Sequence, residues 1–174
     1  MEIWRLVSEL MGKNVAEYLG GPSLGRLPIP RLFLPAGVEQ ITGLEDRAGQ
    51  RLESGYREFL SLTDGMDGFH LGMPLFGCHD WEGSGLTGEA LTFREAMRED
   101  GTPEDVGLPA DIELFPLSID MDGASAIFMM ESSDLLRERI WWVGEGSSSF
   151  FHSFRNLLEF IIDPLSYSPR ETID

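Results

Sequence analysis

The residue types best suited to chemistry lie together at Cys78, His79 and Asp80, where a thiol, an imidazole and a carboxylate follow one another. A cysteine nucleophile needs a base that hydrogen-bonds to its thiol. We expect this tripeptide to end a strand, and neighbouring residues of a strand point to opposite faces. Cys78 and His79 therefore cannot easily pair, and the pattern indicates a small apolar cysteine at a strand end.

Zinc is the metal that these residue types would favour. Its protein ligands usually come in pairs separated by about two to four residues. Cys78 and His79 are adjacent, and the other histidines, His70 and His152, lie far apart. The spacing therefore does not predict a zinc site.

A second candidate is the run from Asp120, Asp-Met-Asp-Gly, which resembles the start of a calcium loop with Glu131 at its twelfth position. Its fifth position is Ala124, which has no oxygen ligand, so a hairpin turn is the better interpretation. The glycine-rich run 83–88 lacks the lysine and following hydroxyl residue of a phosphate loop. We expect no metal, no cofactor and no catalytic site.

The charge of the chain bears on its partners. The net charge is −17 at pH 7 and the sequence pI is near 4.4. Such a surface repels nucleic acid and anionic lipid and attracts basic proteins. Acidity that serves only solubility is the alternative, and composition leaves both interpretations open.

The hydrophobic share of 42% is enough for a core, and the length of 174 residues favours one domain, 1–174.

The cellular compartment is predicted from what the chain lacks. A single cysteine, Cys78, rules out an internal disulfide and favours a reducing compartment. The beginning of the sequence has no apolar run of the secretory type, and no stretch approaches the length of a membrane span. We therefore expect a cytoplasmic protein that binds neither membrane nor nucleic acid.

The elements that would position these residues centre on the stretch 34–81. Apolar residues at helical spacing predict one helix from Ile41 to Ala48 and a second around Tyr56 to Leu60, with Ser54 as its N-cap. A turn at 63–65 follows, and short apolar pieces between glycines up to Phe76 predict strands.

The remaining elements follow from periodicity and from proline and glycine. We predict an N-terminal helix over 4–19, an extended segment over 22–35 that packs against the domain, a glycine-rich loop over 82–88, a helix over 90–98 and a loop over 99–111. Strands over 114–119, 126–130 and 140–143, a turn over 144–149, a helix from about 149 to 163 and a loose tail over 166–174 complete the chain. The order predicts an α+β fold in which helices flank a single, mainly antiparallel sheet.

The adjacent Trp141 and Trp142 point to opposite faces of their strand. An exposed tryptophan would be a natural anchor for a partner. Covering of both faces, by helices on one side and a loop on the other, is the alternative, and the sequence leaves it open.

The central stretch carries an ordered set of apolar, glycine and acidic residues: Pro35, Ala36, Ile41, Leu44, Glu45, Gly49, Leu52, Tyr56, Phe59, Leu60, Gly65, Phe76 and Gly77. This set resembles the pattern of the SMI1/KNR4, or SUKH, family. Glu53 stands where that family has a proline and Asp64 where it has an asparagine, both at turn or cap positions. The segment 151–158 is similar to the family's closing helix, and 117–130 to its central hairpin.

The resemblance implies the family's α+β architecture and a protein that acts by binding. Many bacterial members are immunity proteins that neutralise polymorphic toxins, often nucleases, and fungal relatives are regulatory scaffolds. Nuclease toxins tend to be basic because their substrate is polyanionic, so an acidic inhibitor would be attracted to them. We predict binding of a basic toxin domain, with a scaffold for endogenous partners as the alternative. The predicted contact residues are Asp64, Asp67, Glu82, Glu99, Asp100, Glu104 and Asp105.

Overall fold

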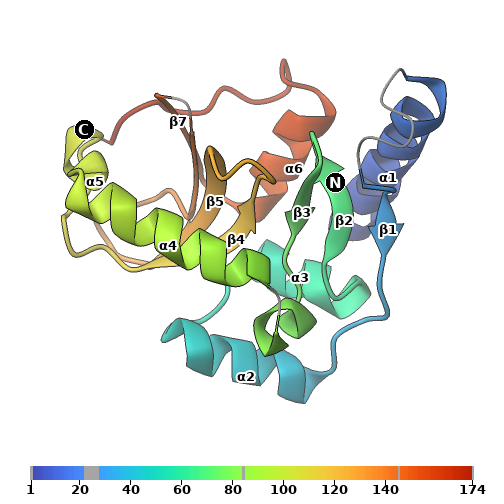
Figure 1. Cartoon of the computed structure of the whole chain (residues 1–174), viewed down its shortest axis with the longest axis horizontal. Helices are drawn as coiled ribbons and strands as arrows, with labels where there is room; N and C mark the ends of the chain where they lie inside the picture. Colours follow the sequence, from blue (N-terminus) through green and yellow to red (C-terminus); the bar gives the residue numbers. More distant parts are fainter. Residues whose placement is uncertain (1, 22–27, 84, 145, 174) are drawn as a thin grey trace.

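The computed structural model describes residues 2–21, 28–83, 85–144 and 146–173. Within them helices and antiparallel strands form an α+β fold (Figure 1). The helices are α1 (Ile3–Gly20), α2 (Val38–Ala48), α3 (Ser54–Leu62), the 3-10 helix η1 (Cys78–Glu82), α4 (Gly85–Glu99), α5 (Thr102–Asp105) and α6 (Phe154–Ile162). The strands are β1 (Arg31–Leu32), β2 (Met66–His70), β3 (Met73–Leu75), β4 (Leu114–Ile119), β5 (Ser125–Met130), β6 (Ile140–Gly144) and β7 (Ser147–Phe151).

The strands form two sheets, so the prediction of a single sheet is wrong. The order is β1-β2-β3 in a three-stranded sheet and β4-β5-β6-β7 in a four-stranded one, and all pairs are antiparallel. β3 runs beside β4, where Phe76 N–H donates to the Leu117 carbonyl over 2.8 Å. Pro74 in β3 and Pro116 in β4 have no N–H to donate, which explains why the ladder does not continue.

Both faces of the four-stranded sheet are buried. In β5, Ile127 and Met129 face a core that includes α1, α2, α3 and α6, whereas Phe128 and Met130 face a second core beneath α4. Figure 1 shows α4 crossing the sheet, with α6 packed against α1 on the other side. A strand covered on both faces reads as a continuous apolar run, as 126–130 does.

The tryptophan pair is covered on both faces. Trp141 is fully buried in the α4-side core. Trp142 is partly buried against the other core, and its Nε1 donates to the Ser125 hydroxyl over 2.8 Å. The edge of the His70 ring meets it, with ring centroids 5.2 Å apart. Neither tryptophan is therefore the exposed anchor that the sequence left open.

The helices predicted near the N-terminus are confirmed as α1, α2 and α3, but the expected cap of α3 is wrong. Ser54 is already helical, and Glu53 is the N-cap. The Glu53 carboxylate accepts the N–H groups of Gly55 and Tyr56 at 2.9 and 3.0 Å. A carboxylate at this position satisfies free N–H groups and opposes the positive end of the helix dipole.

Two predicted boundaries move. α4 begins at Gly85, inside the run expected to be a glycine-rich loop, whereas Ser84 lies outside the described residues.

The segment expected to start the last helix is strand β7 instead, because Phe150 and Phe151 alternate into the two cores. α6 then starts after Ser153, whose hydroxyl accepts the Asn156 N–H. Its end before Asp163 is confirmed. The short helix α5 lies in the segment 99–111 that we expected to be a loop.

The described part of the segment 22–35 is extended and packs against the domain, as predicted, since Pro30 is buried and the Phe33 and His79 ring centroids lie 4.6 Å apart. β1 pairs with β2, yet Ile29 is 65% exposed and Leu34 is 86% exposed. Residues 22–27 of that prediction lie outside the described residues.

The tail that we expected to be loose is held by contacts through residue 173. Phe150 N–H donates to the Arg170 carbonyl and Ile173 N–H to the Val106 carbonyl, each over 2.8 Å. The Tyr167 ring stacks on Phe151, with ring centroids 5.6 Å apart. In the described part of the chain, no helix combines the length and the apolar character needed to cross a bilayer.

His70 makes the stability of the fold depend on pH. Burial, and then the charge of Lys13, lower the pKa of His70 to about 4. The unfolded chain therefore binds an extra proton between the ordinary pKa near 6.5 and 4, so this contribution to stability is present above pH 6.5 and is lost as the pH falls.

We predict that His70→Gln flattens this part of the pH profile. Between pH 6.5 and 4 the natural protein should lose about 2–3 kcal/mol more of its free energy of unfolding than the variant, at about 1.4 kcal/mol per pKa unit. Urea titrations at a series of pH values measure this difference. Parallel profiles for the two proteins would contradict the assignment.

Candidate functional site

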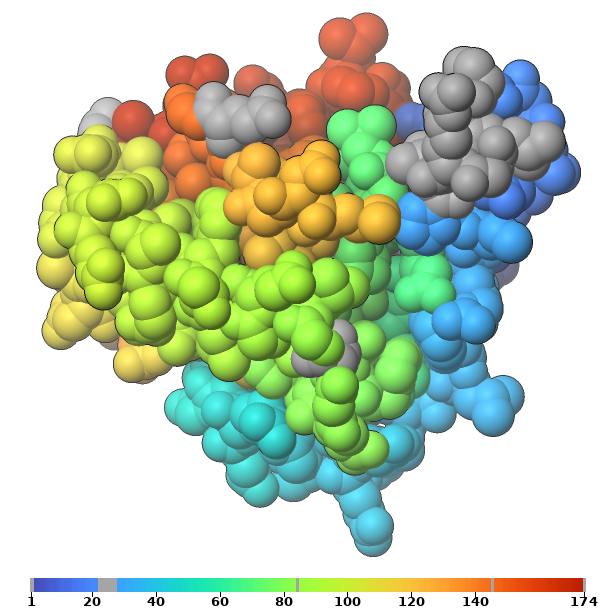
Figure 2. Space-filling model, in the orientation of Figure 1, coloured from blue at the N-terminus to red at the C-terminus, as the bar shows by residue number. Residues whose placement is uncertain are grey.

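The structure brings together only some of the predicted contact residues. Asp64 is buried behind η1, Asp67 lies on β2, and Glu82 ends η1. The other four surround the junction of α4 and α5, which lies at the left of Figures 1 and 2. These four are Glu99, Asp100, Glu104 and Asp105.

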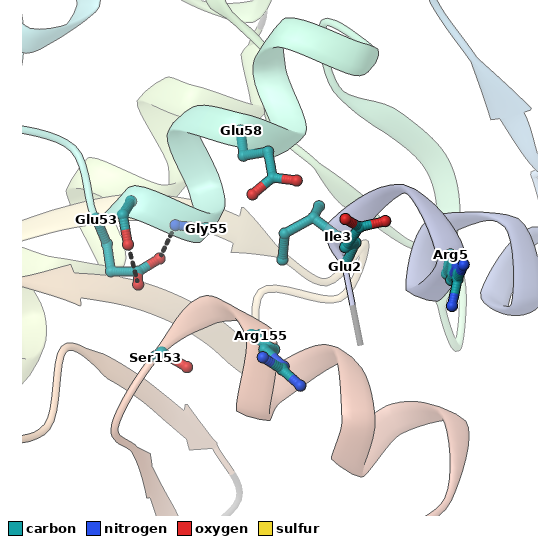
Figure 3. Close-up of a pocket in the computed structure, with 9 residues that line it drawn as sticks. Glu2, Ile3, Arg5, Glu53, Gly55, Glu58, Ser153 and Arg155 are labelled. Atoms are coloured by element: carbon teal, nitrogen blue, oxygen red, sulfur yellow. Dashed lines mark hydrogen bonds between the residues drawn. The ribbon is translucent and has the colours of Figure 1, made fainter.

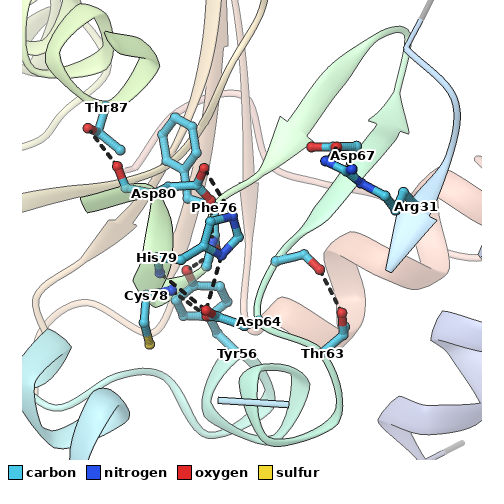
Figure 4. Close-up of polar contacts among 12 residues, drawn as sticks. Arg31, Tyr56, Thr63, Asp64, Asp67, Phe76, Cys78, His79, Asp80 and Thr87 are labelled. Atoms are coloured by element: carbon cyan, nitrogen blue, oxygen red, sulfur yellow. Dashed lines mark hydrogen bonds and ion pairs between the residues drawn. The ribbon is translucent and has the colours of Figure 1, made fainter. Parts of the chain in front are cut away.

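Asp64 is a structural residue, and its prediction as an exposed contact is wrong. Its side chain is buried, with the residue only 6% exposed. One carboxylate oxygen accepts the Cys78 N–H, and the other accepts the His79 N–H over 3.2 Å and lies 3.0 Å from Nδ1 of the His79 ring (Figure 4). The carboxylate thus holds the first turn of η1 against the end of α3.

Close backbone packing surrounds this carboxylate. A Cβ atom on Gly77 would lie 2.1 Å from the Asp64 carbonyl oxygen, so only glycine fits there. Gly77 N–H donates to the Asp80 carboxylate over 2.8 Å. The buried Tyr56 hydroxyl donates to the Phe76 carbonyl over 2.6 Å (Figure 4). We call this arrangement of Tyr56, Asp64, Gly77, Cys78 and His79 the Asp64 corner.

The chemistry of the Asp64 corner does not favour a cysteine nucleophile. Cys78 lies in η1 rather than at a strand end, which corrects that expectation. Burial, followed by the negative charge of Asp64, raises the pKa of the Cys78 thiol to about 12. The thiol is therefore protonated at neutral pH, and the thiolate is the reactive form. Burial also raises the pKa of Asp80.

Asp67 has its charge balanced within the fold. The Arg31 guanidinium donates to its carboxylate from Nη2 over 2.7 Å and from Nε over 3.1 Å. The same guanidinium lies over the Phe33 ring, 4.6 Å from its centroid, and that ring meets His79. Asp67 therefore fastens β1 to β2 and contributes little free negative charge.

Glu82 is exposed beside a hollow of about 380 Å³ between α2 and η1. Glu39 and Arg47 also line the hollow, and the Arg47 guanidinium lies 5.6 Å from the Trp81 ring centroid. This side of the molecule carries both signs of charge and lies apart from the α4–α5 junction (Figure 2).

The α4–α5 junction keeps its negative charge free. α4 ends at Glu99, Gly101 turns the chain with φ of 75°, and Glu104 and Asp105 lie in the single turn of α5. All four predicted acids here are exposed, and within the described residues none of them makes an ion pair. We call Glu99, Asp100, Glu104 and Asp105 the acidic junction.

A hollow of about 720 Å³ was not predicted from the sequence. It lies where α1, α3 and α6 begin, and no local pattern shows that three helix starts so distant in the sequence will meet (Figure 3). Its charges are mixed, because Glu2, Glu58, Arg5 and Arg155 all line it. Glu53 caps α3, and Arg155 donates to Glu159 over 3.0 Å, so these groups have partners within the fold.

Metal ligation finds no support in the described residues, where histidine, cysteine and carboxylate side chains do not gather in a group of three or more suited to an ion. Asp120 of the 120–123 turn serves the hairpin, since its carboxylate accepts the Ala124 N–H over 2.7 Å. Comparison of the chain with protein-family models and with curated protein sequences finds no match.

A pair of substitutions separates the structural aspartate from the surface one. Asp64→Ala leaves the buried N–H groups of Cys78 and His79 without an acceptor, and should lower the free energy of unfolding by about 2–4 kcal/mol. Asp67→Ala, the control, breaks only a partly exposed ion pair and should cost under about 1 kcal/mol. Chemical denaturation measures both. If both variants lost the same small free energy of unfolding, Asp64 would not have the structural role assigned to it.

Proposed function

We propose that this protein is a non-enzymatic binding protein, an immunity protein that neutralises a basic, often nuclease, toxin domain by covering it. The observation that carries the proposal is the acidic junction, where four exposed carboxylates have no ion-pair partner in the described residues. The net charge of −17 adds to the negative field of this surface. Acidic surfaces of this kind steer and hold basic partners.

The Asp64 corner supports a binding role in a second way. The residues best suited to chemistry, Cys78, His79 and Asp80, hold a helix start in place, and the Cys78 thiol remains protonated. A nucleophile needs an activated form and a base aligned with it. The described residues around this cluster supply neither, whereas the acidic junction is open to a protein partner.

A regulatory scaffold is the second candidate function. The observation that favours it is a set of exposed apolar side chains between residue 28 and the first turn of α2, where Ile29, Leu34 and Val38 are 65%, 86% and 74% exposed. Exposed apolar surface marks protein contacts, and two distinct surfaces would suit a protein that holds several endogenous partners. Affinity capture from the native cell separates the two functions by the number and charge of the partners.

Charge reversal tests the role of the acidic junction. A variant with Glu99, Asp100, Glu104 and Asp105 all changed to Lys should bind a captured basic toxin domain with an association rate at least about tenfold lower at low salt, with a smaller difference at high salt. Stopped-flow or surface-plasmon measurements give the rates, and survival of cells that express the toxin gives protection.

The control variant carries the same change in net charge elsewhere on the molecule. Its exposed positions are Glu9, Glu17, Asp46 and Asp122, each changed to Lys. Steering by net charge alone would slow both variants equally, and that result would discard the acidic junction as the contact surface. Loss of protection in the junction variant only would support the proposal.

A further inference from the structure

A preformed apolar hollow of about 370 Å³ lies directly after the acidic junction. It is bordered by the segment that follows α5, by the connection between β5 and β6, and by the chain near residue 173. Its apolar lining consists of Leu108, Pro109, Ile112, Leu135, Leu136 and Ile173.

One wall of this hollow, formed by 107–112 and Ile173, is held by contacts with the rest of the fold. Leu108 and Ile112 are only 4% and 8% exposed and belong to the core beneath α4. Ile173 is seated by its hydrogen bond to the Val106 carbonyl, and it lies so close to Gly107 that a Cβ there would overlap it. A pocket held in this way does not have to be formed when a ligand enters, which lowers the cost of binding.

Leu135 is the most exposed aliphatic side chain of this lining, because it is 97% exposed at the mouth of the hollow. A large aliphatic side chain in that position gains no burial from its own fold. It would lose its exposure to water only against a partner that sits over the hollow.

The mouth of the hollow is acidic. Asp111 and Glu131 line it, Asp134 adjoins Leu135, and all three are exposed and without an ion pair in the described part of the chain.

The nearby cations do not offset this charge fully. The guanidinium of Arg98 donates to the Ile112 carbonyl and to Glu95, and that of Arg139 donates to the Met130 carbonyl. Arg137 is exposed on the same connection. Of these cations only Arg98 is paired with a carboxylate, so Asp111, Glu131 and Asp134 face two guanidinium groups, Arg137 and Arg139, that have no ion pair in the described residues. The carboxylates are in excess, and they add to the charge of the acidic junction.

We propose that this hollow binds one leucine- or methionine-sized side chain of a basic protein segment, whose flanking lysines and arginines face Asp111, Glu131 and the acidic junction. The inference rests on the proposed function and deepens it, because it names the anchor point of the basic partner. Apolar anchors in pockets, ringed by polar contacts, carry most of the binding energy at protein interfaces. Charge complementarity selects the basic segment over an acidic or neutral one.

Synthetic peptides test the inference on the full chain. The probe is a labelled Gly-Lys-Arg-Leu-Arg-Lys-Gly peptide, compared with one that has Ser in place of Leu and one that has Glu in place of each basic residue. Amide NMR spectra locate binding, and fluorescence anisotropy measures affinity. The leucine peptide should shift the amides of 107–112 and 131–136, the serine peptide should bind at least about fivefold more weakly, and the acidic peptide should not bind.

Other outcomes separate the inference from the function on which it rests. Equal binding of the leucine and serine peptides would overturn the anchor pocket while leaving charge attraction intact. Absence of shifts at 107–112 and 131–136 would also overturn it, and the kinetic test of the acidic junction would still decide the proposed function independently.

A matched pair of variants tests the mouth of the hollow. Leu135→Ser should lower the affinity for the leucine peptide by about threefold or more, because the Leu135 side chain would cover the bound leucine. The control is Leu165→Ser, because Leu165 is 96% exposed and lies outside the hollow. Neither side chain carries the core, so both variants should fold. An equal effect of the two changes would contradict the pocket.

Discussion

The buried carboxylate of Asp64 is the constraint on which the arrangement of the molecule depends. It accepts the first N–H groups of η1 and contacts the His79 ring, so it ties the end of α3 to the segment that leaves β3. Gly77, which precedes η1, lies against the backbone of Asp64. Phe76 joins the two sheets, because its N–H donates to the Leu117 carbonyl. A carboxylate buried at such a point is stabilising only when its oxygens are matched by donors, and here they are.

This constraint also shapes the functional argument. The side chains best suited to chemistry, those around Cys78 and His79, lie in the Asp64 corner, where the carboxylates hold the backbone in place. The unpaired negative charge lies elsewhere, at the acidic junction. The acidic junction and the apolar hollow after α5 combine unpaired carboxylates with an exposed leucine. Such a surface suits recognition of a basic protein, since electrostatics brings the partner in and apolar burial retains it.

Periodicity was enough to predict α1, α2, α3 and the β4–β5 hairpin, because each has a strong local pattern. It failed at β7, since Phe151 lies at helical spacing from the apolar residues of α6, and only the burial of Phe150 and Phe151 in opposite cores shows a strand. The division into two sheets depends on the neighbouring strands β3 and β4, far apart in sequence, each carrying a proline without an N–H donor, Pro74 and Pro116. The burial of Asp64 was missed for the same reason, because its donors lie in η1. Exposure at the acidic junction followed from composition alone, in a segment rich in charge, glycine and proline.

Amide hydrogen exchange of Cys78 and His79 in the native protein tests the central claim most directly. If their N–H groups are bound to the buried Asp64 carboxylate, both should exchange about as slowly as the core strand β5, through global unfolding only. Exchange within the time of the first spectrum, while the β5 amides remain protected, would show that the Asp64 corner opens independently and would contradict the account.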